Sequence, residues 1–471
     1  MLSERKDIQS TEYGQICNTF SKDNLVDLCV EKVGVQTGPF GTQLHKEDYV
    51  IEGTPIITVE HLGENYILHQ NTPFVSDLDK ERLSKYHLQE GDIVFSRVGS
   101  VDRRALVREV EDGWLFSGRC LRVRVKKKEI DPTYLSYFFG LESFKEYIRR
   151  IAVGATMPSI NTKILSKVPV YYPDLTTQRA IAHILGSLDD KIELNRKMNE
   201  TLEAMAQAMF KSWFVDFDPV IDNALAAGNT IPEELTERAG QRKALGDKRK
   251  KLPKEIKKLF PNEFIFTDEL GWIPKGWVIS SVGEEYNVTM GQSPPGSTYN
   301  NTDDGIPFFQ GSTDFGFRYP SNRIYCTEPK RFASKDDTLI SVRAPVGDTN
   351  MAHSDCCIGR GVAAAKHKSG SRSFTYYSML QLREHFNKFE AEGTVFGSIN
   401  QKDFKALKSY SFNTELVNEY ERYAGSLDQK IETCSKNISE LSKLRDTLLP
   451  KLLSGELKIE NAEKLIEGVE V

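Results

Sequence analysis

The sequence predicts an α+β fold in which two similar mixed α/β domains are separated by two long helices that pair as an antiparallel coiled coil. Three observations predict it. Large side chains recur in steps of three and four residues along two stretches, Thr176–Trp213 and Thr414–Leu453. Short motifs around the first stretch return around the second, 239 positions later. The remaining segments consist of short β-type runs separated by turn residues.

The first long stretch has one continuous seam of large side chains. A repeat of this kind is typical of a helix packed along a partner helix. A rod with a single apolar stripe cannot bury itself, so the stretch, about 57 Å long at 1.5 Å per residue, requires a partner. Its seam consists of Ile181, Leu185, Leu188, Ile192, Asn195, Asn199, Leu202, Ala206, Met209 and Trp213.

The second long stretch supplies that partner. The motif Ser159–Asn161 returns as Ser398–Asn400, and Leu188–Glu193 returns as Leu427–Glu432. One offset held across a loop and a helix indicates an internal duplication, and therefore a pseudo-twofold repeat. We expect antiparallel pairing because the second domain can begin where the first helix ends; parallel pairing is the alternative. The second seam consists of Tyr420, Ala424, Leu427, Ile431, Cys434, Ile438, Leu441, Arg445, Leu448 and Leu452.

Two polar residues, Asn195 and Asn199, stand at the centre of the first seam. Buried asparagines at such positions fix the register of a coiled coil at some cost in stability. In an antiparallel pair they would meet Ile438 and Cys434. The alternative is that both side chains turn toward solvent, and the sequence favours neither reading.

The repeat order sets the expected domain boundaries. Asp131-Pro132 predicts a helix over Tyr134–Ile151 in the first domain. The basic run 248–251 belongs either to a solvated helical linker or to a phosphate-binding site. We expect an N-terminal arm (1–24), a first mixed α/β domain (25–173), the first long helix (174–216), a charged linker or insertion (217–270), a second mixed α/β domain (271–412), the second long helix (413–455) and a polar tail (456–471).

Composition excludes several classes of protein. The chain has 471 residues, of which 39% are hydrophobic and 27% charged, as in an ordinary globular protein. No apolar run approaches the ~20 residues of a membrane span, and the first residues lack the apolar core of a secretion signal. Seven cysteines without a C-x-x-C pair indicate a reducing, cytoplasmic location. A net charge of −5 does not exclude a local basic groove for nucleic acid.

Catalytic motifs are missing from the sequence. It has neither an H-E-x-x-H helix nor a G-x-x-x-x-G-K-[ST] phosphate loop. Ser293–Gly296 approaches the [NDS]-P-P-[YF] motif of amino-methyltransferases but ends in glycine, which cannot stack on a base. The adjacent Cys356 and Cys357 make a poor metal-binding pair. The sequence therefore predicts no catalytic residues, metal site or cofactor in this chain.

Two similar modules on a rigid rod suit a ligand with a long repeat, and duplex DNA, with turns of ~34 Å, is the obvious candidate. Because the modules differ, the target would be asymmetric, with two dissimilar half-sites and an unread spacer. We assign Ser159–Asn161 and Ser398–Asn400 to phosphate contact or to docking on a helix. Each candidate residue could equally be a solvated loop side chain. The candidates are Gln36, Thr37, Ser96, Arg97, Arg103, Arg104, Asn161, Lys163, Gln292, Ser293, Tyr299, Gln310, Arg343, Asn400, Gln401 and Lys402.

Four motifs, together with the order of the repeats, resemble the specificity subunit of type I restriction-modification enzymes over nearly the whole chain. The motifs are Leu175–Ala182, Leu188–Ile192, Phe210–Phe217 and Leu448–Gly455. The resemblance implies two target-recognition domains, each reading half of a bipartite DNA site, and a coiled coil that sets the spacer. It also implies that the chain itself catalyses nothing.

The resemblance further implies partner subunits. Two methyltransferase subunits would carry S-adenosylmethionine and modify adenine, and motor-nuclease subunits would use ATP and Mg²⁺. The outer helix face at Asp189, Asp190 and Lys191 is where we expect the methyltransferases to dock. The second helix departs from the pattern, because it opens at Asn413 without a Gln-Arg pair such as Gln178-Arg179. The alternatives are a DNA methyltransferase or nuclease that acts alone, and a scaffold that only assembles proteins.

Overall fold

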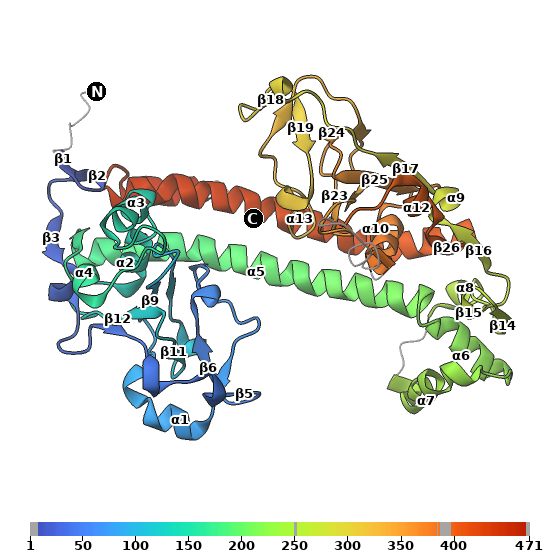
Figure 1. Ribbon diagram of the computed structural model, residues 1–471, viewed down its shortest axis with the longest axis horizontal. Helices are drawn as coiled ribbons and strands as arrows, with labels where there is room; N and C mark the ends of the chain where they lie inside the picture. The colour runs from blue at the N-terminus through green and yellow to red at the C-terminus, as the bar shows by residue number, and fades with distance from the viewer. Residues whose placement is uncertain (1–7, 249–251, 384, 387–396, 468–471) are drawn as a thin grey trace. The chain divides into compact units, whose positions relative to one another are not determined.

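The computed structural model describes residues 8–248, 252–383, 385–386 and 397–467. The chain forms two compact units, residues 1–196 with 436–471, and residues 197–435. Two helices of 40 residues each, α5 (Leu175–Phe214) and α13 (Thr414–Leu453), contribute one half to each unit (Figure 1). The predicted stretches therefore match α13 at both ends and α5 to within one residue.

Side-chain hydrogen bonds cap the N-termini of the two long helices. Asp174 accepts hydrogen bonds from the backbone N–H of Thr177 at 3.1 Å and from its hydroxyl at 2.7 Å, so it caps α5. Asn413 accepts from the N–H of Glu415 at 2.9 Å at the start of α13. Gly455, with φ +73°, follows the last turn of α13, as expected of a helix stop.

The seams of α5 and α13 face each other within each unit. In the second unit, the Tyr420 hydroxyl donates to the Ala206 carbonyl at 3.2 Å and Asn199 contacts Ser435 at 3.1 Å. Residue numbers rise along α5 as they fall along α13, so the segments run antiparallel, as predicted. In the first unit, Leu185 shares its core with Leu448. Every residue of both seams is buried or half-buried.

The two central asparagines behave differently. Asn199 is buried, and its amide donates to the Ser435 hydroxyl on α13, beside the predicted Cys434. Asn195 donates to the Lys191 carbonyl of its own helix at 2.8 Å. One asparagine therefore links the helices, and the other satisfies itself locally.

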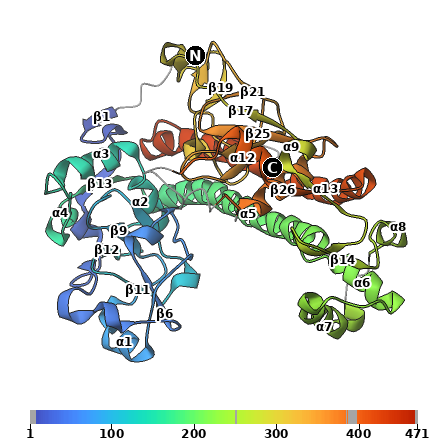
Figure 2. The same cartoon turned by 45° about the vertical axis from the view of Figure 1, so that its right-hand side comes forward.

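The first unit contains a five-stranded sheet in the order β4-β12-β9-β10-β7, a four-stranded sheet β11-β6-β8-β5 and two paired ribbons, β1-β2 and β13-β3. Figures 1 and 2 both place α2 and α4 at one end of this unit and α1 with β6 at the other. The strands are β1 (Ile8–Thr11), β2 (Gly14–Cys17), β3 (Ser21–Asn24), β4 (Val35–Thr37), β5 (Tyr49–Val50), β6 (Thr54–Ile57), β7 (Glu64–Asn65), β8 (Phe74–Val75), β9 (Ile93–Ser96), β10 (Arg104–Leu106), β11 (Leu115–Phe116), β12 (Cys120–Val123) and β13 (Pro169–Tyr172). The helices are α1 (Asp77–Arg82), α2 (Pro132–Phe138), α3 (Glu142–Ile151), α4 (Thr162–Ser166) and α14 (Ile459–Glu467).

The second unit repeats this plan with sheets β17-β25-β22-β23 and β18-β20-β19-β24-β21 and ribbons β14-β15 and β16-β26. The strands are β14 (Phe264–Thr267), β15 (Gly271–Pro274), β16 (Val278–Ser281), β17 (Tyr286–Met290), β18 (Tyr299–Asn300), β19 (Ile306–Phe309), β20 (Tyr325–Cys326), β21 (Phe332–Ala333), β22 (Thr338–Ser341), β23 (Thr349–Met351), β24 (Cys356–Ile358), β25 (Val362–His367) and β26 (Lys408–Ser411). The helices are α6 (Asp218–Ala227), α7 (Thr236–Ala244), α8 (Lys254–Lys257), α9 (Val282–Glu285), α10 (Arg372–Gln381) and α12 (Gln401–Ala406).

Short 3-10 helices connect these elements in both units. They are η1 (Leu25–Leu28), η2 (Gly41–Gln43), η3 (Lys46–Asp48), η4 (Val59–His61), η5 (Ser84–Tyr86), η6 (Glu109–Glu111), η7 (Glu233–Leu235), η8 (Gly246–Lys248), η9 (Gly296–Thr298) and η10 (Ser312–Asp314).

The structure corrects three expected segments. Residues 8–24 are not a separate arm, because β3 pairs with β13 and Tyr13 and Ile16 are buried in the first core. The tail after Gly455 forms α14, whose Ala462 is fully buried in the same core. The charged linker is helical, as expected, but Val220 and Ile256 pack into the second core. Residues 249–251 of its basic run lie outside the described residues.

The helix predicted over Tyr134–Ile151 is two helices. Asp131 caps α2 at Thr133 and Tyr134, as Pro132 suggested, but α2 ends at Phe138. Gly140 follows, and any side chain there would overlap the guanidinium of Arg104, which donates to the Ser136 carbonyl at 2.9 Å. The chain turns around this buried arginine before α3 begins at Glu142.

Candidate nucleic-acid interface

Three backbone hydrogen bonds hold together the loops at one end of the strands of the first unit. We call this end of the unit its edge. The N–H of Gly38 donates to the Cys120 carbonyl at 3.2 Å, and the N–H of Arg97 donates to the Arg119 carbonyl at 2.8 Å. The N–H of Ile160 then donates to the Arg97 carbonyl at 2.9 Å. Chain segments that are far apart in sequence, following β4, β9 and α3 and preceding β12, therefore meet at one place.

The second unit builds the same edge from different residues. Gly291 N–H donates to the Val362 carbonyl at 2.9 Å, and Val342 N–H donates to the Gly361 carbonyl at 2.9 Å. Ile399 N–H donates to the Val342 carbonyl at 3.0 Å. Gly38 and Gly291 occupy equivalent positions, and both must be glycine because neighbouring backbone lies very close to them. A Cβ on Gly291 would overlap the Gly359 carbonyl, and one on Gly38 would overlap Ser117. The two edges are equivalent by the internal repeat.

The edge of the first unit carries basic and aromatic side chains. Arg97 donates to the Gly118 carbonyl at 3.1 Å, and its guanidinium lies 5.9 Å from the ring centre of Phe40. Phe40 is 61% exposed, and Arg119 is exposed as well. A cavity of about 540 Å³ opens between Phe40, Arg119 and Tyr49. Arginines and an exposed aromatic beside a hollow are groups that nucleic-acid interfaces use.

The edge of the second unit is more polar. Arg343 and Arg360 are exposed, and so are the predicted candidates Gln292 and Gln310. The Ser293 hydroxyl accepts from the backbone N–H of Arg360 at 3.2 Å and thereby fixes this loop. Arginine and glutamine are the side chains that read guanine and adenine through paired hydrogen bonds. The shared backbone frame therefore presents different reading groups in the two units.

The repeated Ser-Ile-Asn motif has a structural role. Asn161 accepts from the N–H of Ile164 at 2.9 Å and caps α4, and Asn400 accepts from the N–H of Asp403 at 3.0 Å and caps α12. Ile160 and Ile399 are buried. The motif therefore positions the edge, and both asparagine side chains are engaged as helix caps. Lys163, Gln401 and Lys402 are exposed in the first turns that follow.

Several other candidates are engaged by the protein itself. Gln36 accepts from Arg122 at 2.5 Å, and Arg103 donates to the Leu62 carbonyl. Ser96 is fully buried, and Arg104 is buried with a pKa lowered to about 10 by loss of solvation. Thr37 is half-buried, with its backbone paired to Leu121 in the sheet, and the Tyr299 hydroxyl donates to the Pro294 carbonyl at 2.8 Å. Of the first unit's predicted arginines, only Arg97 remains at the edge.

Sequence reasoning missed two edge arginines, Arg119 and Arg360. Arg119 lies directly before β12 and Arg360 two residues before β25, and each stands beside a glycine, in Gly118-Arg119 and in Gly359–Gly361. Glycine lets the backbone pack closely while the neighbouring arginine points outward. This Gly-Arg signal before a strand occurs in both repeats and could have been read from the sequence.

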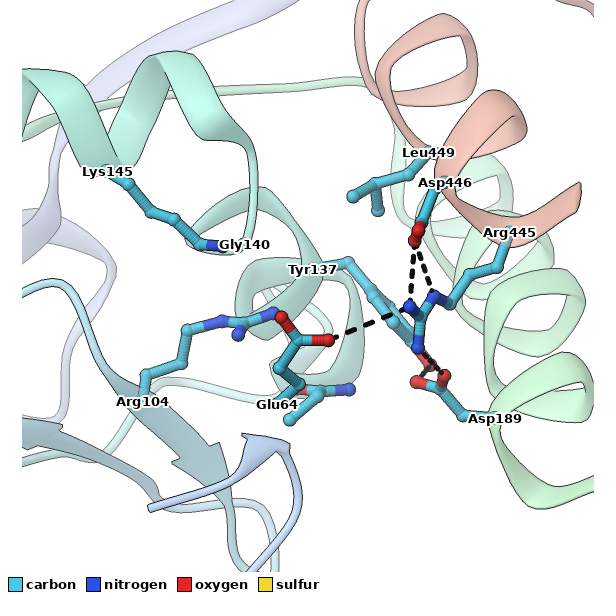
Figure 3. Close-up of a pocket in the computed structure, with 10 residues that line it drawn as sticks. Glu64, Arg104, Tyr137, Gly140, Lys145, Asp189, Arg445, Asp446 and Leu449 are labelled. Carbon is cyan, nitrogen blue, oxygen red and sulfur yellow. Dashed lines mark hydrogen bonds and ion pairs between the residues drawn. The ribbon is translucent and has the colours of Figure 1, made fainter. Parts of the chain in front are cut away.

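A second polar site in the first unit joins the recognition domain to both long helices (Figure 3). Asp189 on α5 accepts from Arg445 on α13 at 2.8 Å and from the hydroxyl of Tyr137 on α2 at 2.7 Å. Arg445 also lies 3.7 Å from Glu64 on β7 and 2.8 Å from Asp446. Burial opposes the charge on Arg445, but its bond to Asp189 raises its pKa above the usual value. The site locks three elements together.

The second unit has an equivalent lock. Asp428 on α13 accepts from the Tyr377 hydroxyl at 3.1 Å and from Arg318 at 3.0 Å, and Arg318 also donates to Glu203 on α5. The side chains of Arg318 and Asp428 are both 0% exposed. Although burial lowers the pKa of Arg318, Tyr376 and the other neighbours raise it well above the usual value. Each recognition domain is thus fixed to its own half of the helix pair.

This lock corrects the expected docking face on α5. Asp189 faces the recognition domain, with a side chain only 11% exposed, and so cannot receive a partner subunit. Asp190 is 71% exposed and lies 3.5 Å from Arg108, and Lys191 is exposed. Only the last two lie on an accessible face.

Within the part of the chain that the structure describes, no three His, Cys, Asp or Glu side chains gather as a metal site would require. No described helix combines the length and apolar character needed to cross a membrane.

A duplicated β-rich module, with each copy joined to half of an antiparallel helix pair and each presenting an arginine-bearing edge, defines a two-site binding protein. Residues 38–204 match the family model described as the type I restriction modification DNA specificity domain. This match, and the specificity subunits among the relatives, support the resemblance that the sequence motifs indicated.

The chain matches known relatives over most of their length. The chain is 28% identical to a Methanocaldococcus jannaschii protein named as the MjaX specificity subunit of a type I restriction enzyme, over 97% of this chain and 98% of that one. It is 26% identical to the HindI specificity subunit of Haemophilus influenzae, over 83% and 92%. A solved structure, the S subunit of the M. genitalium type I restriction-modification system, matches with a TM-score of 0.55 at 16% identity, over 96% and 98%. That likeness supports the fold.

Proposed function

We propose that this chain is the DNA-specificity subunit of a type I restriction-modification complex and that it reads an asymmetric bipartite site, one half-site per unit. The observation that carries the proposal is the duplicated edge. The same backbone hydrogen bonds recur in both units, while the side chains they present differ. Two dissimilar half-sites require equivalent backbone positions that carry different base-contacting side chains.

The arginines of the two edges contact different half-sites. Arg97 and Arg119 serve the first, and Arg343 and Arg360 serve the second. An arginine that meets guanine through both ring-edge acceptors discriminates by ~1–3 kcal/mol against a wrong base. The net charge of −5 does not oppose this, because local arginines and the partner subunits supply the positive field. A chain of this kind acts in the cytoplasm, where the DNA lies.

Catalysis belongs to partner subunits in this proposal. Two methyltransferase subunits carry S-adenosylmethionine and modify adenine, and motor-nuclease subunits use ATP and Mg²⁺. A docking face for one of them is the outer side of α5 in the second unit, where Met198 and Met205 are 45% and 54% exposed. Seven residues apart, they lie on the same side of the helix. Methionine side chains adapt to many packing partners and are common at protein-binding surfaces.

The decisive experiment maps methylated sites in cells that carry the chain with its modification subunits. Arg119→Ala is expected to relax one half-site only, and Arg360→Ala the other only. Lys128→Ala removes an exposed cation of the first unit that is not a candidate residue, and it is the control that leaves both sequences unchanged. Either arginine variant altering both halves equally would contradict the assignment of one half-site to each unit.

The alternative, a DNA methyltransferase or nuclease acting alone, makes a different prediction. The purified chain would then transfer methyl groups from S-adenosylmethionine to DNA, or cleave DNA, without partners. We expect neither reaction, and we expect salt-sensitive, sequence-selective DNA binding by the assembled complex. Such binding also separates the specificity subunit from a protein scaffold.

A further inference from the structure

The tip of the first hairpin, β1-β2, inserts a tyrosine into the first unit. Tyr13 is 7% exposed, and its ring centre lies 5.4 Å from that of Phe138 and 6.1 Å from that of Tyr171. Its hydroxyl donates to the carbonyl of Pro169 at 2.8 Å. The hairpin is thereby pinned between α2 and β13 by one aromatic side chain.

The second unit has the same hairpin in the same place. Thr11 donates to the Gly14 carbonyl at 2.9 Å in β1-β2, and Thr267 donates to the Gly271 carbonyl at 2.9 Å in β14-β15. Both glycines have positive φ, 103° and 70°. The residue before the glycine is Tyr13 in the first hairpin and Leu270 in the second. Leu270 is therefore the counterpart of Tyr13.

The surroundings of these two residues also correspond. Pro169 pairs with Asn24 in β13-β3 as Lys408 pairs with Ser281 in β26-β16, so the Lys408 carbonyl stands in the position of the one that Tyr13 uses. Tyr171, two residues further along, corresponds to Tyr410. Phe138 follows the tyrosine that bonds Asp189, and its counterpart Ser378 follows the tyrosine that bonds Asp428.

Two large aromatic side chains, Tyr13 and Phe138, are thus replaced by the smaller Leu270 and Ser378 in the second unit. The volume they would fill is not closed by the surrounding core, and a cavity of about 220 Å³ remains. Leu270, Ser378 and Tyr410 line it together with Phe214 and Phe412. The lining is mostly aromatic and apolar and includes Lys408, so the cavity suits a ring that carries one hydroxyl.

The rim of the cavity lies at the surface. Lys408 is exposed, and its ammonium pairs at 2.6 Å with Glu269 in the turn of the second hairpin. This pair links the hairpin to β26 beside the opening, and Leu270 lines the cavity without filling it. A group that fills the cavity must therefore enter from outside the unit.

We propose that this cavity is a docking pocket for a tyrosine side chain of a partner protein in the assembled complex. The phenol ring takes the place that Tyr13 takes in the first unit, and its hydroxyl donates to the Lys408 carbonyl. In the first unit the equivalent site is filled by Tyr13, a side chain of the protein itself. The occupant of the cavity in the second unit is therefore a protein side chain too. The partner assignment rests on the proposed function, whereas the pocket itself does not.

The pocket is tested first with p-cresol, the tyrosine side chain as a free molecule, by ligand-observed NMR on the full chain. We expect saturable binding to the wild-type chain and at least a tenfold loss in Leu270→Tyr, which fills the cavity with the residue that the first unit uses. Leu78→Tyr adds a tyrosine at an 80% exposed site and is the matched control that keeps binding. Absence of binding to the folded wild-type chain would overturn the pocket.

The partner is tested by titrating the chain with its modification subunits. Leu270→Tyr is expected to weaken assembly at least tenfold, while Leu78→Tyr leaves it unchanged. Normal assembly of Leu270→Tyr would overturn the partner assignment even where p-cresol binds. Thermal unfolding checks that the variants fold. DNA half-sites mapped for the control complex report on the proposed function separately, because a complex that selects no sequence would refute that function and leave p-cresol binding intact.

Discussion

The hydroxyl of Tyr137 donates a hydrogen bond of 2.7 Å to Oδ2 of Asp189. Tyr137 belongs to α2 of a recognition domain and Asp189 to the long helix α5. The other oxygen of Asp189 accepts from Arg445 of α13, so one carboxylate holds three elements. The repeat places Tyr377 and Asp428 in the same relationship in the second unit. A recognition domain attached in this way cannot rotate on the helices without breaking a charged hydrogen bond.

Asp189→Ala is expected to destabilise the first unit by ~2–3 kcal/mol, because it removes two hydrogen bonds to a charged group and leaves Arg445 partly unpaired. The free energy of unfolding, measured with a chemical denaturant, gives the loss. Asp190→Ala is the control: Asp190 is 71% exposed, and its contact with Arg108 should contribute at most ~1 kcal/mol. Equal losses for the two neighbours would show that the lock does not hold the domain.

Arg318→Ala is expected to cost more, roughly 3–5 kcal/mol, because it leaves Asp428 charged and buried without its cation. Arg323→Ala removes an arginine of the same unit whose side chain is 60% exposed and bonded to Asp314 at 2.7 Å. Because that contact is exposed to solvent, the control should lose much less stability than Arg318→Ala. A similar free energy of unfolding for both variants would argue against a buried ionic centre.

The sequence was sufficient to predict the two long helices, but it was insufficient to predict which residues lie exposed at the two edges. The four-three seams predicted α5 and α13 closely, because a coiled coil repeats one simple pattern over many turns. The cap residues could not be predicted with equal success: Asn161 and Asn400 have the right chemistry for DNA, but the next turn of helix uses their side-chain oxygens. Likewise, nothing local marks Arg104 as buried, since Ser136 and Gly140 enclose it only after folding.

The stability of the second unit is expected to fall in mild acid through His367. This ring is buried against Tyr286 and Phe374, and burial lowers its pKa below 6.5, although Glu285 at 4.0 Å opposes the shift and Lys368 adds to it. The unfolded chain therefore binds a proton that the folded chain does not. Above about pH 6.5, His367 does not change the free energy of unfolding. As the pH falls from there toward the pKa of His367 in the folded chain, the free energy of unfolding decreases.

Denaturant unfolding at pH 7.5 and 5.5 measures this effect. His367→Gln is expected to lose less stability between the two pH values than the wild-type chain does. His353→Gln replaces an exposed histidine of the same unit and should keep the wild-type difference. Identical pH dependence in all three proteins would remove His367 as the cause.

The length of the paired helices is expected to set the DNA spacer. Deleting residues 195–201 from α5 and 434–440 from α13 removes one heptad, and therefore two seam residues, from each helix. The pair shortens by ~10.5 Å, which is about 3 base pairs of a ~34 Å turn. Methylation mapping of the complex should then find both half-sequences unchanged and the spacer about 3 base pairs shorter. Deleting the heptad from α5 alone mismatches the seams and should weaken folding without defining a new spacer. An unchanged spacer in the double deletion would mean that the helices do not measure the distance between the half-sites.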